Sequence, residues 1–303
     1  MGADGMQFDV IIVGGSYAGL SAALQLARAR RRVLVLDTGL PRNRNARHAH
    51  GFIGHDGQPP QQIAAQARAD VLAYPDVTWC EDSAVHAAAV GEDAPAFEVQ
   101  CASGKRYRAH RLILAHGVRD ELPQIEGIAE RWGRSVFHCP YCHGYELEGG
   151  RIGVVACSGD GGAHQGLLLP EWGKVTLFCH EEAGPDESLS GELGQRGVTV
   201  ERTLISRIED TATVVLENGR RIELDALFIA PRGVLSSPLA EQLGCSLEDG
   251  GCITADAAKQ TTVEGVFACG DAARMAGSIA LAVGEGALAG VAAHQSLLGL
   301  LSR

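Results

Sequence analysis

The chain has 303 residues, of which 46% are hydrophobic and 21% charged, and this composition is typical of a folded protein of about two domains. Its 37 acidic residues outnumber its 26 Lys and Arg residues, which gives a formal net charge of −11. Nucleic acids and anionic membranes attract basic surfaces, so the composition argues against both as partners.

Nine cysteines are spread along the chain, and residues 1–7 lack the charged and then apolar pattern of a secretory leader. An odd number of cysteines argues against a secreted disulfide scaffold, so we expect a cytoplasmic protein. The most apolar long stretch, Ala276–Leu300, contains Glu285 and His294. We expect a buried helix there rather than a membrane span.

The first predicted elements form a βαβ unit. Residues 8–13 are an apolar, β-branched run that predicts a buried parallel strand, and residues 20–30 follow a helical pattern. A glycine-rich turn, residues 14–19, joins them, and the next strand, residues 32–37, ends in Asp37. A glycine turn between a strand and a helix is typical of dinucleotide-binding folds.

The same pattern returns about 140 residues later, with strands at 151–156 and 174–179, a glycine-rich turn at 157–162 and a helix from His164 to Glu171. Further strands are predicted at 112–117, 226–230 and 265–269, and Asn218-Gly219 predicts a hairpin. We therefore expect an α/β protein of two Rossmann-like domains of the three-layer FAD/NAD type. The first is discontinuous (1–117 and 244–303), and the second (118–243) is inserted in it.

The first glycine turn is the predicted cofactor site. Backbone N–H groups at such a turn can approach a pyrophosphate at the N-terminus of the helix, and an acid at the end of the next strand can bind a ribose. A C-terminal Gly-Asp pair before a helix of small residues strengthens this interpretation. The predicted cofactor-binding residues are Gly14, Gly15, Ser16, Tyr17, Ala18, Gly19, Asp37, Gly117, Gly270, Asp271, Ser278 and Ile279.

The stretch His138-Cys139-Pro140-Tyr141-Cys142-His143 contains the most informative motif. A Cys-x-x-Cys spacing places two sulfurs within disulfide reach, so Cys139 and Cys142 are either a redox pair or half of a zinc site. The flanking His138 and His143 are potential ligands in the second case. The chain contains no second Cys-x-x-Cys, and we therefore favour the redox pair and expect no metal.

The glycine turn, the Gly-Asp pair and a Cys-x-x-Cys within the inserted domain together resemble the low-molecular-weight thioredoxin reductases. The resemblance covers nearly the whole chain and implies bound FAD and a homodimer. It also implies that Cys142 lies close to the flavin, while Cys139 exchanges with the substrate. Family members usually have an acid after the second Cys, whereas this chain has His143, which can also transfer protons.

The second glycine turn departs from the thioredoxin reductase pattern. Cys157 stands at the first glycine position, so close approach of a pyrophosphate is doubtful there. Cys179 is followed by His180, Glu181 and Glu182 with no Arg, and two carboxylates would repel the 2′-phosphate of NADPH. We expect no NADPH binding, whereas NADH stays possible.

A flavin and a dithiol pair without a nicotinamide site favour electron flow from a substrate dithiol to FAD and then to molecular oxygen. This resembles the dithiol oxidases that close disulfides in natural products such as gliotoxin, holomycin and romidepsin. The catalytic residues would be Cys139, Cys142 and His143. His48 and His50, in a loop assigned to the flavin domain, are further candidates for accepting a thiol proton. The alternatives are a reductase of thioredoxin-like proteins and a redox sensor without turnover.

Overall fold

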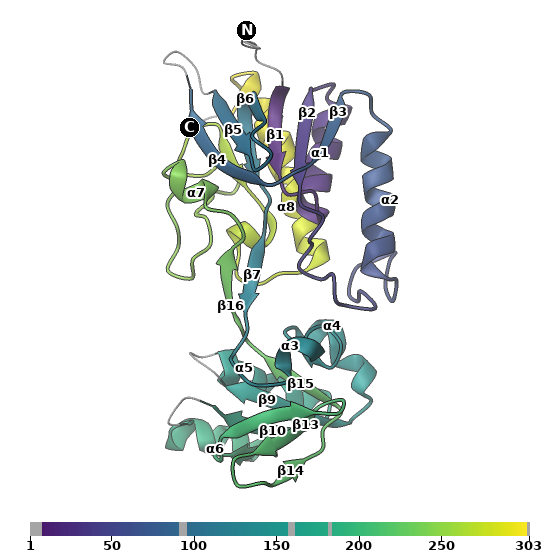
Figure 1. Cartoon of the computed structure of the whole chain (residues 1–303), viewed down its shortest axis with the longest axis vertical. Helices are drawn as coiled ribbons and strands as arrows, with labels where there is room; N and C mark the ends of the chain where they lie inside the picture. The colour runs from purple at the N-terminus through teal and green to yellow at the C-terminus, as the bar shows by residue number, and fades with distance from the viewer. Residues whose placement is uncertain (1–7, 91–95, 157–160, 181–183, 302–303) are drawn as a thin grey trace. The chain divides into compact units, whose positions relative to one another are not determined.

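The computed structural model describes residues 8–90, 96–156, 161–180 and 184–301, and the chain forms two compact units (Figure 1). Unit 1 consists of Met1–Arg42, Gln61–Arg119 and Gly233–Arg303, and unit 2 of Asn43–Pro60 and Asp120–Arg232. The chain enters the longer segment of unit 2 along β7 (Val118–Glu121) and returns to unit 1 along β16 (Arg232–Leu235), and these two strands pair with each other. No helix in the described ranges is long and apolar enough to cross a membrane.

Unit 1 is built on a seven-stranded sheet, in which β6 (Arg106–Leu114) pairs with three other strands. The last residues of β6 pair in parallel with β1 and β17, whereas its first residues pair in antiparallel with β5. The strand order is β3 (Val77–Glu81), β2 (Val33–Asp37), β1 (Phe8–Val13), β6 (Arg106–Leu114), β5 (Phe97–Cys101) and β4 (Ala84–Ala89), with β17 (Val266–Ala268) beside β6.

Helices α1 (Tyr17–Arg28) and α8 (Ile279–Leu297) pack against each other beside this sheet (Figure 1). Glycines make the close contact possible, because a Cβ added to Gly286 would lie 2.1 Å from the Ala18 carbonyl oxygen. The expectation that α8 is a buried helix is only partly right, since Leu281, Leu288 and Val291 are exposed on it. The remaining helices of unit 1 are α2 (Pro60–Leu72), α7 (Leu239–Gln242) and η3 (Gly270–Ala273).

Unit 2 has a five-stranded parallel sheet and a three-stranded antiparallel one. The parallel order is β11 (Thr199–Glu201), β10 (Lys174–Cys179), β9 (Arg151–Ala156), β15 (Ala226–Ile229) and β8 (Val136–Phe137). The antiparallel order is β12 (Ile205–Glu209), β13 (Thr213–Leu216) and β14 (Arg221–Ile222), and the predicted Asn218-Gly219 turn joins the last two. The helices are α3 (Ile128–Arg131), α4 (Pro140–His143), η1 (Tyr145–Leu147), α5 (Gly161–Leu168), η2 (Leu169–Glu171) and α6 (Glu187–Gln195).

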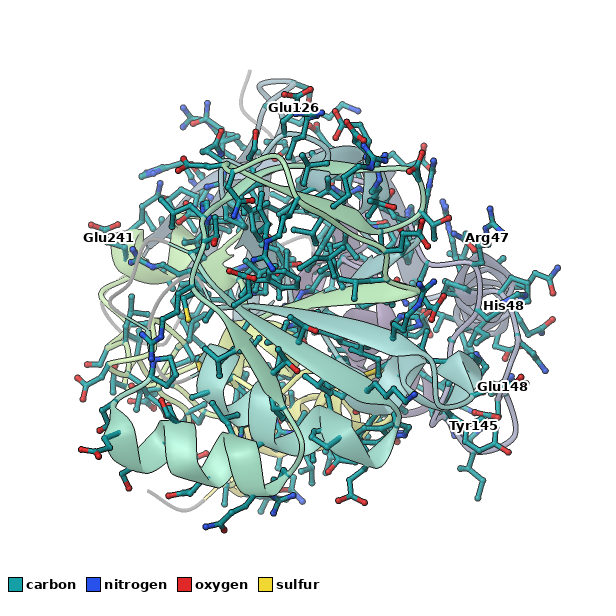
Figure 2. All side chains as sticks on the ribbon, turned by 90° about the horizontal axis from the view of Figure 1, so that it is seen from below. Arg47, His48, Glu126, Tyr145, Glu148 and Glu241 are labelled. Atoms are coloured by element: carbon teal, nitrogen blue, oxygen red, sulfur yellow. A yellow bond between two sulfur atoms is a disulfide. The ribbon has the colours of Figure 1, made fainter. Side chains whose placement is uncertain are left out.

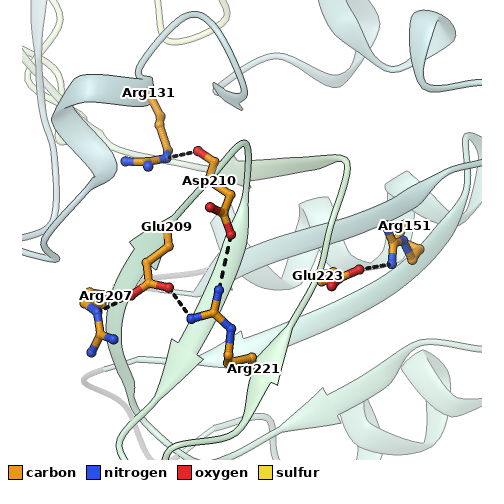
Figure 3. Close-up of polar contacts among 7 residues, drawn as sticks. All are labelled: Arg131, Arg151, Arg207, Glu209, Asp210, Arg221 and Glu223. Atoms are coloured by element: carbon orange, nitrogen blue, oxygen red, sulfur yellow. Dashed lines mark hydrogen bonds and ion pairs between the residues drawn. The ribbon is translucent and has the colours of Figure 1, made fainter.

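Exposed ion pairs run across the antiparallel sheet of unit 2 (Figure 3). Glu209 pairs with Arg207 at 2.6 Å and also with Arg221, which reaches Asp210 at 3.2 Å. The pKa of Glu209 is lowered by the hydrogen bond from Arg207 and then by the one from Arg221. These pairs lie on a solvated surface, where ion pairs contribute little to stability.

The segment Asn43–Pro60, which the sequence placed in the flavin domain, belongs to unit 2. An isolated β-bridge between Ala49 and Gln58 closes it into a loop, and a Cβ on Gly133 would lie 2.8 Å from the Asn45 Cβ. The earlier placement was wrong because position along the chain does not determine which unit a loop packs against.

Candidate active site

The first glycine turn has the close backbone contacts that only glycine allows. Gly14 has φ of +105°, and a Cβ there would lie 2.3 Å from the Ala115 carbonyl oxygen. A Cβ on Gly19 would lie 1.8 Å from the Gly14 carbonyl oxygen. The turn therefore holds β1, β6 and the start of α1 close together, and it leaves backbone N–H groups at the helix N-terminus for an anionic ligand.

The helix that follows this turn begins with the predicted residues Ser16, Tyr17 and Ala18. Ser16 is the N-cap of α1 in an extended conformation, and its side chain makes no capping hydrogen bond. Tyr17 and Ala18 are buried in the first turn of the helix. Ser16 therefore caps the helix through its backbone conformation and not through a side-chain hydrogen bond.

Asp37 lies at the end of β2, beside the glycine turn. Its Oδ1 accepts a hydrogen bond from the Gly15 amide at 3.0 Å. The ring of Trp79 lies next to both, because a Cβ on Gly15 would be 2.4 Å from it. Within the described part of the chain, the buried Trp79 Nε1 has no hydrogen-bond partner. An unsatisfied buried donor beside a carboxylate and a glycine turn fits a nucleotide at this site.

The predicted Gly270-Asp271 pair begins η3, and Gly270 has φ of +68°. Asp271 Oδ2 accepts a hydrogen bond from Arg42 Nη1 at 2.8 Å, so this carboxylate is already paired. Ser278 caps α8, since its Oγ accepts from the Leu281 amide at 3.2 Å, and Ile279 is the first residue of the helix.

Glu285 on α8 is a residue of this region that the sequence analysis did not assign. It is buried, and its Oε2 accepts a hydrogen bond from the Gly270 amide at 2.9 Å. Its Oε1 lies 2.8 Å from Lys259 Nζ and 3.1 Å from Arg274 Nε. A lone acid within a helix of small residues was the available signal, because a buried carboxylate requires cationic or hydrogen-bonding partners.

Gly117 follows β6 and has φ of +65°. Its carbonyl oxygen lies 3.0 Å from His116 Nδ1, and burial lowers the pKa of His116 to about 4. His116 Nε2 is buried and, among the described residues, has no partner. A neutral imidazole with Nδ1 donating to the carbonyl therefore leaves an acceptor nitrogen for a ligand.

Cys139 and Cys142 form a disulfide in unit 2, with Cα atoms 5.3 Å apart. Cys139 is the N-cap of α4, and Pro140 is the first helical residue, where its missing N–H costs no hydrogen bond. The described residues contain no cluster of three or more His, Cys, Asp or Glu side chains with the geometry of a metal site. The two sulfurs are bonded to each other, as the Cys-x-x-Cys spacing allows.

His143 ends α4 directly after the pair and stacks on Phe137, with ring centroids 4.1 Å apart. Its pKa is lowered to about 4, first by burial and then by the charge of His50, while Glu146 opposes the shift. The imidazole is thus neutral near pH 7 and can accept a proton from a thiol.

Gln165 on α5, which the sequence analysis missed, holds the backbone directly before the disulfide. The buried Gln165 donates from Nε2 to the His138 carbonyl oxygen at 2.7 Å. No motif indicates such a contact, because Gln165 lies 27 residues along the chain from His138.

Two exposed tyrosines lie close in sequence to the disulfide. Tyr141 and Tyr145 are 72% and 83% exposed, whereas tyrosine side chains are commonly at least partly buried. The rings of Tyr141 and Trp172 are nearly perpendicular, with centroids 5.4 Å apart. Trp172 also packs closely on Gly144, because a Cβ added to Gly144 would lie 2.8 Å from the Trp172 Cγ. The ring of Tyr141, which lies between the two cysteines in the sequence, is therefore open to solvent on much of its surface.

The remaining cysteines of the chain behave differently. Burial raises the pKa of Cys101 to about 11 and that of Cys269 to about 12, so neither forms a thiolate near neutral pH. Cys179, Cys245 and Cys252 are also buried. Within the described residues, Cys139 and Cys142 are the two sulfurs joined to each other.

The second glycine turn is described only in part, since Cys157, Gly159, Glu181 and Glu182 lie outside the described residues. Gly162 on α5 packs against the end of β9, because a Cβ there would lie 2.7 Å from the Ala156 Cα. The close packing of helix on strand that a dinucleotide fold needs is present at this point.

Residues 8–292 match the family described as pyridine nucleotide-disulphide oxidoreductase. The chain belongs to this family. Its members bind FAD, so the predicted cofactor, fold class and thiol/disulfide oxidoreductase chemistry are confirmed.

Similar proteins span almost the full chain. The thioredoxin reductase sirT of Leptosphaeria maculans is 32% identical over 96% of this chain and 95% of its own. The crystal structure of an oxidoreductase from Agrobacterium tumefaciens is 52% identical, with a TM-score of 0.92 over 97% of this chain and 99% of that one. The structure of HlmI is 34% identical, with a TM-score of 0.91 over 96% and 93%. The predicted resemblance to thioredoxin reductase-like oxidoreductases is thereby confirmed.

Proposed function

We propose that the protein oxidises a small-molecule dithiol to an intramolecular disulfide, with molecular oxygen as the final acceptor. The observation that carries this proposal is the Cys139–Cys142 disulfide, followed directly by His143 at the end of the same short helix. An imidazole next to the pair can take up protons from incoming thiols. The exposed Tyr141 and Tyr145 supply a surface for a compact apolar substrate.

One substrate thiol gives its proton to His143, and the thiolate attacks Cys139 Sγ, which breaks the Cys139–Cys142 bond and releases Cys142 as a thiolate. The second substrate thiol then displaces Cys139, which closes the substrate disulfide and leaves Cys139 reduced. FAD, when bound, supplies the two-electron acceptor that reoxidises the pair, and transfer of these electrons to oxygen gives hydrogen peroxide.

The predicted cofactor residues would hold FAD through Gly14, Gly15, Gly19 and Asp37, where the backbone cradle and the unsatisfied Trp79 donor fit a nucleotide. The proposal also includes a homodimer in the cytoplasm. The exposed Leu281, Leu288 and Val291 on α8 support a second copy as partner, because exposed apolar side chains on one helix favour burial in an interface.

One observation favours the alternative, a reductase fed by a nicotinamide. The sequence offers no Arg directly after β10, yet Arg202 reaches this region from beyond β11. Its Nη2 donates to the Pro185 carbonyl oxygen at 3.4 Å, and its Nη1 lies 2.7 Å from the position of a Cβ on Gly184. An Arg near the end of the second strand of a dinucleotide fold can accommodate a 2′-phosphate, and Arg202 would take this role from the end of the neighbouring strand.

Stopped-flow mixing of the FAD-loaded protein separates the two functions. We expect a dithiol such as dithiothreitol to bleach the flavin rapidly, and oxygen to restore its colour with release of hydrogen peroxide. Rapid bleaching by NADPH that Arg202→Ala abolishes would instead establish the reductase. A protein bleached by neither reagent would be a sensor without turnover.

A further inference from the structure

One aromatic ring shares the solvent side of α4 with a sulfur of the redox pair. Pro140 and Gly144 lie four residues apart, and so on one helical face, and both are buried. The Gly144 amide donates to the Pro140 carbonyl oxygen at 2.7 Å, which continues the helical pattern to Gly144. Tyr141 and Cys142 follow Pro140 by about 100° and about 200° around the helix. Both side chains therefore lie on the side of α4 that faces away from its buried face.

The exposure of these residues agrees with this placement. The ring of Tyr141 is exposed, and Cys139 and Cys142 are both partly exposed. The Cα atoms of Tyr141 and Cys142 are neighbours in the chain, about 3.8 Å apart across the peptide bond. A small thiol that reaches the disulfide from solvent therefore arrives beside the Tyr141 ring.

The ring of Tyr141 is supported from one side by Trp172. The two rings are nearly perpendicular, with centroids 5.4 Å apart. Trp172 is itself fixed, because it packs on Gly144 and against a buried apolar cluster that includes Val154 and Phe228. A perpendicular contact with one neighbour covers at most one face of a ring, so Tyr141 keeps an open face in a supported position.

Tyr145 offers a comparison within the same segment. It is exposed as well, and Figure 2 shows it projecting from unit 2 near Glu148. In the described part of the chain, its ring contacts no other aromatic side chain. A tyrosine that is already fixed loses less side-chain freedom when a ligand binds, so Tyr141 is the better binding surface of the two.

We propose that Tyr141 binds the substrate and selects dithiols that carry a flat ring next to their sulfurs. The proposal rests on the proposed function and narrows its substrate class. The flat ring of the substrate stacks on the open face of Tyr141, since aromatic rings favour offset-stacked contacts, while its sulfurs reach the disulfide. Tyr141 takes no part in bond making, so the thiol exchange and its electron balance are unchanged.

The test compares two dithiols that close to disulfide rings of the same size. Dithiothreitol has a polar chain between its sulfurs, whereas ortho-bis(mercaptomethyl)benzene has an aromatic ring there. Flavin bleaching of the FAD-loaded protein, followed by stopped flow over a range of dithiol concentrations, gives the half-saturating concentration and the limiting rate separately. The variants are Tyr141→Ala and Tyr141→Phe, and Tyr145→Ala is the matched control.

We expect Tyr141→Ala to raise the half-saturating concentration of the aromatic dithiol about tenfold, as the loss of one aromatic contact should. The limiting rate and both values for dithiothreitol should stay unchanged. Tyr141→Phe keeps the ring and should match the wild type, as should Tyr145→Ala. Equal weakening for both dithiols would overturn the proposal, because the ring would then support the disulfide and not the substrate. An equally large effect of Tyr145→Ala would overturn it as well.

A second measurement keeps this result separate from the proposed function. Calorimetry of the oxidised, FAD-loaded protein with the closed aromatic disulfide measures binding without electron transfer, and Tyr141→Ala should weaken this binding about tenfold. If neither dithiol bleaches the wild-type flavin, the proposed function is wrong whatever the calorimetry shows. If both dithiols bleach it and Tyr141→Ala changes neither half-saturation nor binding, the role of Tyr141 alone is wrong.

Discussion

The two units handle charge in opposite ways. In unit 1 the buried Glu285 is fixed between Lys259 and Arg274 and holds the Gly270 amide. In unit 2 the charged and titratable groups near the disulfide are partly open to water, and the imidazole of His143 is neutral. The first arrangement pairs a buried carboxylate with two cations, whereas the second leaves titratable side chains partly exposed to water. This difference suits the proposed binding of FAD in unit 1 and the proposed thiol exchange in unit 2.

The largest expected effect is at the disulfide. Cys142→Ser removes the sulfur that leaves as a thiolate when a substrate attacks Cys139, and we expect it to stop flavin reduction by a dithiol altogether. Stopped-flow absorbance of the flavin measures this. Cys139→Ser should also prevent turnover but leave a free Cys142 thiolate, whose charge-transfer band with the flavin can be recorded. Normal bleaching of Cys142→Ser would show that the pair is not the route of the electrons.

The next effect concerns His143. His143→Ala should slow thiol-to-flavin electron transfer about 100-fold or more while FAD stays bound, since a positioned base contributes about 10²–10⁴-fold. Because the pKa of His143 is lowered to about 4, the wild-type rate should hold as pH falls from 7 to 5 rather than decline near pH 6.5. A decline centred near pH 6.5 that disappears in His143→Ala would contradict the lowered pKa.

The sequence predicted the backbone features of unit 1 because they are local. Gly14 and Gly19 lie within one turn, and the clash of a Cβ there with neighbouring backbone follows from strand–turn–helix geometry alone. The strands on either side follow from runs of apolar residues. The same locality predicted the Cys139–Cys142 pair, since three residues of separation suffice for a disulfide.

The residues that the sequence analysis missed or assigned to the wrong unit depend on contacts between distant parts of the chain. Glu285 appeared only as an interruption of an apolar stretch, because its partner Lys259 lies 26 residues away. His50 was assigned to the wrong unit, and its contact with Glu146 forms only when the loop Asn43–Pro60 packs with unit 2. Gln165 likewise reaches the His138 carbonyl only after β9 and α5 have formed.

Unit 1 can be tested through Glu285. Glu285→Gln would leave Lys259 and Arg274 without their shared carboxylate and weaken the hold on the Gly270 turn. We expect the dissociation constant for FAD to rise about tenfold, equivalent to ~1.4 kcal/mol. Fluorescence titration of the apoprotein with FAD measures it. Glu241→Gln, an exposed acid on α7 of the same unit (Figure 2), is the control and should leave FAD affinity unchanged.

A smaller effect is expected on stability as pH changes. The pKa values of His143 and His116 are lowered to about 4 by burial, against about 6.5 for an unfolded histidine. Between these values the unfolded chain binds more protons than the folded one, so the free energy of unfolding should fall as pH drops from about 6.5 to about 4. Urea midpoints across this range measure the loss, and His143→Gln should reduce it. A midpoint independent of pH would contradict the burial of both rings.

The smallest effect is expected at the surface of unit 2. Glu209 pairs with Arg207 and Arg221 (Figure 3), and the side chains of all three are partly exposed. Glu209→Gln should therefore leave flavin reduction by a dithiol unchanged and alter the melting temperature only slightly. The variant matters as a counterpart to Tyr141→Ala, because both replace a side chain at the surface of unit 2. If the two variants raised the half-saturating concentration of the aromatic dithiol equally, the effect of Tyr141 would reflect a general change in the unit. A rise in Tyr141→Ala alone would place substrate recognition beside the disulfide.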